Sequence, residues 1–294
     1  MAVCETVYLN GAFVPAGKAQ VSAFDRGFLF AHAAYEVTAV YKGKLIDFDG
    51  HAARLSRTLA GILIPDTMGG AGLRAMHQQL LDVNGMDEGL IYLQVTAGDY
   101  GARDFAGPEL ITPTVFAYCD QKPLIGAGAR DGIRAITLPD TRWTRRDMKT
   151  TQLLSQALAY RAARAAGAET ALMIEDGLIT EGASANFWIV DAEGQLRTRH
   201  LSSSILAGIT RDAVISQLRG DGIEIVEAAF DVETALGARE AFTTSAGALI
   251  APVLSIDGQM IGAGKPGPVT RHVQRLYYKA IGADIAKVAP WSLL

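Results

Sequence analysis

Four turn dipeptides, each between two short strand-like runs, constrain the fold of this chain more than any other feature. They are Asn10-Gly11, Lys42-Gly43, Asp176-Gly177 and Asp257-Gly258. Two-residue turns of this kind join neighbouring strands as antiparallel hairpins. The sequence contains few strand–helix–strand units besides these hairpins, so the pattern argues against a Rossmann or TIM-barrel architecture.

Helical periodicity occurs in both halves of the chain. One apolar stripe, followed by Gly85 as a stop signal, consists of Leu73, Met76, Leu80 and Leu81. A second, ending before Gly167, consists of Leu153, Leu154, Ala157, Leu158 and Ala162. Hairpins combined with amphipathic helices predict an α+β protein.

Residues 121–132 separate the two halves. This stretch contains a proline, three glycines and few residues able to anchor a core, as expected of a linker. We therefore expect an N-terminal α+β domain at residues 1–120, an interdomain linker at 121–132 and a C-terminal domain at 133–294. A chain of 294 residues is long enough for two domains.

Charge and cysteine content narrow the class of partner. The chain has 27 basic and 31 acidic residues, and the basic ones are scattered, which argues against a nucleic-acid groove or an anionic membrane surface. No apolar run approaches the roughly 18 residues of a membrane span, and the N-terminus lacks the pattern of a secretory leader. Cys4 and Cys119 cannot form a disulfide framework. We expect a cytoplasmic protein that acts on small molecules.

Two common ligand motifs are weak here. Gly262, Gly264 and Gly267 match the GxGxxG pattern, but Pro266 stiffens the loop and too few residues follow to complete a nucleotide-binding unit, which favours a plain turn. The five histidines show no metal-ligand spacing with Cys or Glu, so no metal site is expected.

Lys149 differs from the other lysines because it lies between a strand and an amphipathic helix. Partial desolvation there would lower the pKa of its amine into the nucleophilic range. The alternative is an ordinary lysine in water at a helix entry.

Two further segments are candidates for ligand contacts. Glu181 precedes the small residues 182–185, which would let a flat ligand approach closely; the alternative is a solvated loop carboxylate. Gly208, Ile209 and Thr210 come just before a helix, where free N–H groups could bind a phosphate; the alternative is an ordinary N-cap threonine.

Several longer segments, taken in order, resemble those of the fold-type IV pyridoxal-phosphate enzymes, and most closely the D-amino-acid transaminases. They are FDRGFLF and YEVTAVY within residues 24–41, IYLQVTAG at 91–98, RWTRRDMKTTQLLSQALA at 142–159, Glu181-Gly182 with Asn186-Phe187, ILAGITRDAVI at 205–215 and FTTSAGALIAPV at 242–253. The resemblance covers nearly the whole chain. It implies a homodimer with a smaller N-terminal α/β domain and a larger C-terminal pseudo-barrel domain that binds the cofactor.

The resemblance also implies roles for individual residues. Lys149 would form the Schiff base with pyridoxal 5′-phosphate and move a proton between the substrate Cα and the cofactor C4′. Glu181 would pair with the pyridinium nitrogen. Arg54 and the backbone N–H groups of Ile209 and Thr210 would hold the phosphate.

The remaining implied contacts are with the ring, the phosphate loop and the substrate. The residues implied are Ser184, Leu206, Ser245 and Ala246 for the cofactor, and Tyr35 and Arg103 for the substrate. Two departures stand out. Phe105 lies where the D-specific members have a histidine two residues after the arginine, with one extra residue in the loop. Ala246 lies where a hydroxyl is often found.

The favoured function is transamination between a D-amino acid, such as D-alanine, and a 2-oxo acid. Within the same fold, the alternatives are an (R)-selective amine transaminase, a branched-chain L-amino-acid aminotransferase and an aminodeoxychorismate lyase-type enzyme. A non-enzymatic binding protein is the alternative from another class. The expected partners are an amino donor and a 2-oxo acid acceptor, with no nucleic acid and no membrane.

Overall fold

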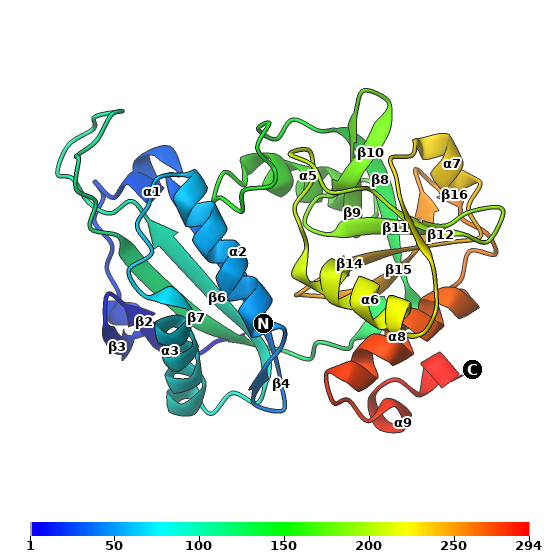
Figure 1. Ribbon diagram of the computed structural model, residues 1–294, viewed down its shortest axis with the longest axis horizontal. Coiled ribbons are helices and arrows are strands. Elements are labelled where there is room, and N and C mark those ends of the chain that lie inside the picture. The colour runs from blue at the N-terminus through cyan, green and yellow to red at the C-terminus, as the bar shows by residue number, and fades with distance from the viewer. Residues whose placement is uncertain (1, 294) are drawn as a thin grey trace. The chain divides into compact units, whose positions relative to one another are not determined.

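The computed structural model describes residues 2–293, which form two compact units (Figure 1). Unit 1 comprises the chain up to Leu124 together with Met148–Gln152, and unit 2 comprises Ile125–Asp147 and the chain from Leu153 onward. No helix among the described residues has both the length and the apolar character needed to cross a bilayer.

Unit 1 is an antiparallel sheet with helices packed on one face (Figure 1). The strand order is β3-β2-β7-β6-β4-β5, and β1 also pairs with β7. The strands are β1 (Ala2–Val3), β2 (Thr6–Leu9), β3 (Ala12–Pro15), β4 (Ala33–Tyr41), β5 (Lys44–Leu45), β6 (Glu88–Thr96) and β7 (Thr114–Gln121). The helices are η1 (Ala16–Lys18), α1 (Arg26–Phe30), α2 (Phe48–Gly61) and α3 (Gly69–Asn84). Helices α2 and α3 share one apolar core with the sheet.

Unit 2 contains a nine-stranded mixed sheet in the order β10-β9-β8-β15-β14-β11-β12-β13, with β16 on β15. The strands are β8 (Ile133–Pro139), β9 (Thr170–Glu175), β10 (Leu178–Gly182), β11 (Asn186–Val190), β12 (Leu196–Thr198), β13 (Ile225–Glu227), β14 (Glu240–Ser245), β15 (Leu249–Ile256) and β16 (Gln259–Met260). The helices are α4 (Ala127–Asp131), α5 (Leu154–Ala165), α6 (Ile209–Gly220), α7 (Val232–Leu236), α8 (Pro268–Ala280), α9 (Ile285–Val288) and η2 (Pro290–Leu293). Strand β8 runs parallel to both β9 and β15.

All four predicted hairpin turns are confirmed. Their first residues have φ of 48° at Asn10, 51° at Lys42, 50° at Asp176 and 49° at Asp257, and the following glycines are also at positive φ. This is the backbone of the mirror-image turns whose twist matches that of the paired strands. The turns join β2 to β3, β4 to β5, β9 to β10 and β15 to β16.

The passage between the units runs through residues 121–132. These residues include the end of β7 and the short helix α4, and the break between the units follows Leu124. The chain then returns to unit 1 for the segment Met148–Gln152. The N–H of Thr151, in this segment, donates to the carbonyl of Ala33 in β4. This hydrogen bond ties the segment to the sheet of unit 1.

The two predicted helical stripes have different outcomes. In α3 the stripe of Leu73, Met76, Leu80 and Leu81 is buried, and Gly85 ends the helix in the left-handed conformation, as predicted. In α5 the predicted helix is present, but the expected stripe does not form its buried face, because Leu154 is 74% and Leu158 is 54% exposed. Ala159 and Ala163 form the buried face instead, since small side chains let this helix pack closely against β9.

Candidate active site

Glu181 is a buried carboxylate near the end of β10, a strand with an irregular register between Ile179 and Gly182. Oε1 accepts a hydrogen bond from Arg142 Nη1 at 2.6 Å, and Oε2 accepts one from Asn186 Nδ2 at 2.9 Å. The backbone N–H of Leu206 lies 3.2 Å from both oxygens. Three donors face a group with about four acceptor sites, so a further N–H donor can still be accepted.

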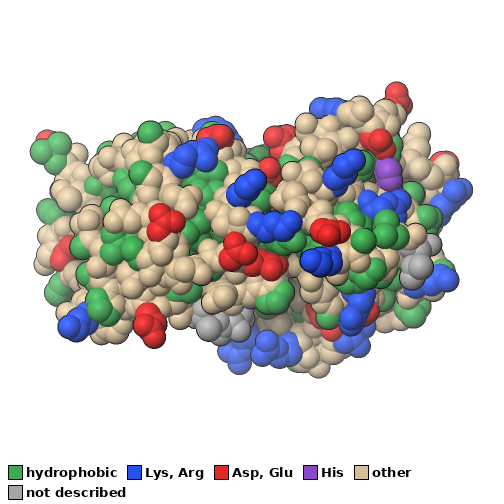
Figure 2. All heavy atoms as spheres, turned by 90° about the horizontal axis from the view of Figure 1, so that it is seen from below, with side chains coloured by type: hydrophobic (Ala, Val, Ile, Leu, Met, Phe, Trp, Pro, Cys, Tyr) green, Lys and Arg blue, Asp and Glu red, His purple; other side chains and the backbone are tan. Residues whose placement is uncertain are grey.

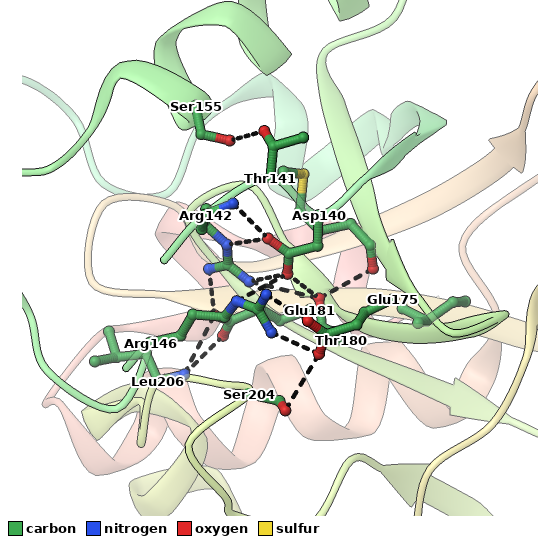
Figure 3. A network of polar contacts seen from close by, with 12 residues as sticks. Asp140, Thr141, Arg142, Arg146, Ser155, Glu175, Thr180, Glu181, Ser204 and Leu206 are labelled. Carbon is green, nitrogen blue, oxygen red and sulfur yellow. Dashed lines mark hydrogen bonds and ion pairs between the residues drawn. The ribbon is translucent and has the colours of Figure 1, made fainter. Parts of the chain in front are cut away.

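Arg142 links Glu181 to a second buried carboxylate, that of Asp140 (Figure 3). Its Nε and Nη2 donate to the two oxygens of Asp140 at 2.9 and 2.7 Å. The Thr180 hydroxyl donates to the same Asp140 carboxylate at 2.7 Å. The network continues through Arg146, which forms a two-pronged ion pair with Glu175. Sequence reasoning missed Arg142; an Asp and an Arg two residues apart at the end of a strand were the available signal.

The two carboxylates that share Arg142 have opposite pKa shifts. Burial raises the pKa of Glu181, and the Arg142 guanidinium offsets only part of this effect. Burial also acts on Asp140, but hydrogen bonds and charge from Arg142 prevail and hold the pKa of Asp140 below its ordinary value. Glu181 is therefore a carboxylate for which another cationic donor would be favourable.

Hydrogen bonds of Asn186 and Leu206 connect the Glu181 carboxylate to the loop just before α6. Gly208 is the N-cap and offers no side-chain hydrogen bond to the helix, so the alternative of a Thr210 N-cap is wrong. A Cβ on Gly208 would lie 1.9 Å from Asn186 Oδ1. Asn186 Nδ2 also donates to the Leu206 carbonyl at 2.9 Å, tying β11 to the loop before the helix. The N–H groups of the first turn suit an anion such as phosphate.

Three other predicted cofactor residues lie at turns of unit 2. The Ser184 and Tyr160 hydroxyls are 2.5 Å apart, and both side chains are exposed. Ser245 Oγ accepts from the Ala248 N–H at 3.2 Å, in the turn where Ala246 also lies. None of these contacts involves the Glu181 carboxylate.

Lys149 lies in unit 1, on the segment that returns to β4. The Tyr35 N–H donates to the Lys149 carbonyl at 3.0 Å, and the Lys149 N–H donates to Thr58 Oγ1 at 3.3 Å. Lys149 Nζ is 4.0 Å from the centroid of the Tyr35 ring, close enough for a cation–π contact. The structure thus brings together the predicted cofactor lysine and the predicted substrate-side tyrosine.

Arg54 has a buried carboxylate partner that sequence reasoning did not anticipate. Its Nε and Nη2 donate to the two oxygens of Glu36, each at 2.7 Å. His51, one helical turn before Arg54, lies 2.8 Å from Glu36 through Nδ1. Burial opposes ionisation of Glu36, but the Arg54 charge prevails and holds the pKa of Glu36 well below its ordinary value.

Arg103 lies in the exposed loop between β6 and β7. Its guanidinium carbon is 4.9 Å from the ring centroid of Phe105 and 5.5 Å from that of Phe30. Phe105, two residues after Arg103, therefore contacts the arginine itself.

The GxGxxG segment leads into a helix N-terminus that is already occupied by a carboxylate of the chain. Glu240 accepts from the N–H groups of Val269 and Thr270 at the start of α8, at 3.0 and 2.8 Å. A Cβ on Gly267 would lie 2.1 Å from the Glu240 carboxyl carbon. The glycine serves the packing of Glu240, which supports the plain-turn interpretation.

Comparison with known proteins places these features in one family. The family model described as amino-transferase class IV matches residues 33–256. The chain belongs to the class IV aminotransferases. The D-alanine aminotransferase of Bacillus licheniformis is 38% identical over 283 residues, covering 96% of this chain and 99% of that protein. The D-alanine aminotransferase of Staphylococcus haemolyticus is 34% identical over 276 residues, covering 94% and 97%.

The fold of this class IV aminotransferase also matches solved structures. A branched-chain amino acid aminotransferase of Escherichia coli superposes with a TM-score of 0.88 at 25% identity, covering 97% of this chain and 98% of that one. The predicted family, the α+β fold class, the aminotransferase assignment and the dependence on pyridoxal phosphate are confirmed.

Proposed function

We propose that this aminotransferase transfers the amino group of a D-amino acid, such as D-alanine, to a 2-oxo acid. The observation that carries the proposal is the buried Glu181 carboxylate, bonded through Asn186 to the loop before the uncapped N-terminus of α6. A buried acid with a raised pKa suits a protonated ring nitrogen, and free N–H groups suit a phosphate. The similarity to D-alanine aminotransferases over 96% of the chain supports the D-amino-acid class.

The proposed cofactor contacts divide between ring and phosphate. Glu181 would keep a proton on the ring nitrogen, and Leu206 and Ser184 would contact the ring. Arg54, the N–H groups of Ile209 and Thr210, and the turn with Ser245 and Ala246 would hold the phosphate. The Arg54 guanidinium is already paired with Glu36, whereas the first turn of α6 would offer an anion the positive end of the helix dipole.

In the proposed chemistry the only group that the protein itself moves is a proton. Bound pyridoxal phosphate supplies an electron sink for the electron pair left at the substrate Cα. Lys149 Nζ would take the proton from the substrate Cα as a general base and deliver it to C4′ of the bound cofactor, and with the 2-oxo acid it would move a proton in the opposite direction. Tyr35, whose ring faces Lys149 Nζ, limits where this amine can lie on the substrate side.

Arg103 is the proposed ligand of the substrate α-carboxylate. A charged hydrogen bond contributes roughly 1.5–3 kcal/mol, so a single arginine should favour amino acids over carboxylate-free amines by about one to two powers of ten. Because such a site does not depend wholly on a carboxylate, we also expect slow turnover of an (R)-amine such as (R)-1-phenylethylamine.

We also propose a cytoplasmic homodimer. Both cysteines are free thiols, which fits a reducing compartment. The exposed Leu154 and Leu158 on α5 form an apolar strip that a second copy would cover. On the face shown in Figure 2 acidic side chains lie among the basic ones, which supports small-molecule rather than nucleic-acid partners.

The deciding experiment tests the cofactor and the donor class together. Borohydride reduction of the holoenzyme should fix pyridoxal phosphate to the peptide that contains Lys149. Lys149→Ala should lose this label and nearly all transamination, whereas Lys44→Ala, at an exposed lysine of β5, should keep both. Label on another peptide, or full activity of Lys149→Ala, would refute the assignment.

The donor panel then compares D-alanine, L-leucine and (R)-1-phenylethylamine. We expect D-alanine to have the highest kcat/KM, and Arg103→Ala to reduce D-alanine turnover more than amine turnover. If L-leucine is the best donor, the D-specific assignment is wrong.

A further inference from the structure

Arg26 fastens the loop that carries Arg103. It is the first residue of α1 and is 5% exposed. Its Nη1 donates to the carbonyl of Asp104 at 2.5 Å and its Nη2 to the carbonyl of Phe105 at 2.9 Å. These carbonyls belong to the two residues that directly follow Arg103, so one guanidinium fork fixes the backbone beside it.

Arg26 is itself held in one orientation by its surroundings. Its Nε lies 3.4 Å from His32 Nδ1, and the other ring nitrogen of His32 donates to the Ile62 carbonyl at 2.7 Å. Its backbone N–H donates to Gly98 at 2.9 Å. Gly107, at φ 73°, packs so closely that a Cβ there would lie 2.9 Å from Arg26 Nη1. The loop therefore closes over a fixed guanidinium.

Two phenyl rings restrict the Arg103 side chain. The rings of Phe30 and Phe105 are 5.3 Å apart, and the Arg103 guanidinium lies within cation–π range of both. Phe30 also lies 4.9 Å from the guanidinium carbon of Arg26. Uncharged rings orient the guanidinium without neutralising it, which leaves its charge available to an anion.

The same short stretch of chain supports both Arg103 and Lys149. Phe30 ends α1, and the next residue, Ala31, accepts from Thr151 Oγ1 at 3.2 Å. Tyr35, four residues on, donates its N–H to the Lys149 carbonyl. Residues 30–35 therefore connect the aromatic contacts of Arg103 to the Lys149 segment.

We infer that Arg26 and Phe105 are positioning residues for Arg103 and thereby set the preference of the enzyme for substrates that carry an α-carboxylate. The inference rests on the proposed function, in which Arg103 binds this carboxylate. Arg26 fixes the backbone after Arg103, and the Phe105 ring, 4.9 Å from the guanidinium carbon, supports the orientation of the side chain.

The first test varies Phe105 in the holoenzyme. An exposed cation–π contact corresponds to a factor of about two to five in affinity. Phe105→Leu should raise the KM for D-alanine by about this factor with little change in kcat, and leave kcat/KM for (R)-1-phenylethylamine unchanged. Phe105→Tyr, which keeps the ring, should behave as the wild type. Phe28→Leu, at an exposed phenyl ring of α1, is the control and should leave kcat/KM unchanged for both donors.

The second test varies Arg26 and includes a readout independent of activity. Arg26→Lys keeps the charge but loses the fork to two carbonyls, so trypsin should cleave faster after Arg103, as measured by mass spectrometry of the released peptide. The KM for D-alanine should rise at least as much as in Phe105→Leu, while the amine is unaffected.

The outcomes distinguish a failure of the proposed function from a failure of the inference about Arg26 and Phe105. If Arg103→Ala leaves the ratio of D-alanine to amine turnover unchanged, the carboxylate role in the proposed function is wrong and the inference falls with it. If Arg103→Ala lowers that ratio but Arg26→Lys and Phe105→Leu do not, the proposed function stands and the inference is overturned. Equal losses on both donors would show a purely structural role and would also overturn it.

Discussion

Glu181 is subject to two opposing effects on its pKa. Burial raises the pKa, and the Arg142 guanidinium at 2.6 Å lowers it. Arg142 is not wholly available to Glu181, because it also binds Asp140 through two hydrogen bonds. The negative charge of the Glu181 carboxylate is thus only partly compensated, and a protonated ring nitrogen would compensate it further.

Glu181→Gln tests this balance. The amide keeps the shape and an acceptor oxygen but cannot retain a ring proton by charge, so we expect the cofactor to bind and kcat to fall by about two to three orders of magnitude. The measurement is single-turnover kinetics with D-alanine alongside cofactor titration. Glu175→Gln, at the outer end of the same network, is the control and should be near wild type. A kcat for Glu181→Gln within a few-fold of wild type would contradict the role.

The site residues that sequence reasoning found share a local signal. Lys149 and Glu181 stand in distinctive junctions, a strand-to-helix passage and a run of small residues. Glu36 has no such signal, and the Asp-x-Arg pattern at Arg142 does not identify its partner Glu181. Both residues act through partners distant in sequence: Glu181 is 39 residues from Arg142, and Arg54 is 18 from Glu36. Contacts of this kind depend on strand register, which the pattern of a single sequence does not give.

Helices α6 and α8 show how the same local sequence can serve different ends. Each follows a glycine N-cap without a side-chain cap of its own. At α8 the carboxylate of Glu240, a residue of β14, accepts hydrogen bonds from the N–H groups of the first turn. At α6 Asn186 lies against the glycine but directs its amide to Glu181 and Leu206. Only tertiary contacts distinguish the anion site from the filled one.

Gly208→Ala should weaken cofactor binding without distorting the backbone. The φ of Gly208 is −70°, which any residue adopts, but the new Cβ would displace Asn186. Loss of the two Asn186 hydrogen bonds, at about 1 kcal/mol each, predicts a Kd for pyridoxal phosphate raised by about tenfold or more. Gly220→Ala, in open space at the end of the same helix, is the control. Equal affinities for the two variants would show that the close contact between Gly208 and Asn186 does not support cofactor binding.

Elements were predictable to the extent that local rules fix them. The hairpin turns follow from residues able to adopt positive φ, and α3 follows from its apolar stripe and Gly85. The buried face of α5 did not follow, because a stripe of large apolar residues predicts burial and the sheet instead admits Ala159 and Ala163. Close helix-to-sheet packing favours the smaller side chains there.

At the scale of the whole molecule, acid stability depends on buried ionisable groups in unit 1. His77 on α3 is buried beside Phe48 and donates from Nδ1 to the Leu73 carbonyl at 2.8 Å. Burial lowers its pKa to about 4. The unfolded chain takes up this proton near pH 6.5, so stability from neutral His77 is complete above that pH and is lost as the pH falls toward 4.

His77→Phe should remove this part of the pH dependence. We expect the wild type to lose roughly 3 kcal/mol of unfolding free energy between pH 6.5 and 4 through this group, and the variant to lose correspondingly less. Urea unfolding of the apoenzyme across this range is the measurement. His200→Gln, at an exposed histidine, should retain the wild-type slope. Parallel profiles for wild type and His77→Phe would show that His77 does not contribute.

The return of residues 148–152 to unit 1 has a consequence for the order in which the protein can fold during synthesis. The first residues of β4 hydrogen-bond to this segment, through Tyr35 to Lys149 and through Ala33 to Thr151. A nascent chain that has reached only Leu124 contains nearly all of unit 1 but lacks these partners. At typical elongation rates the ribosome needs roughly one to five seconds more to add them. The edge that receives Lys149 must therefore wait, exposed, while the opening strand of unit 2 is being made.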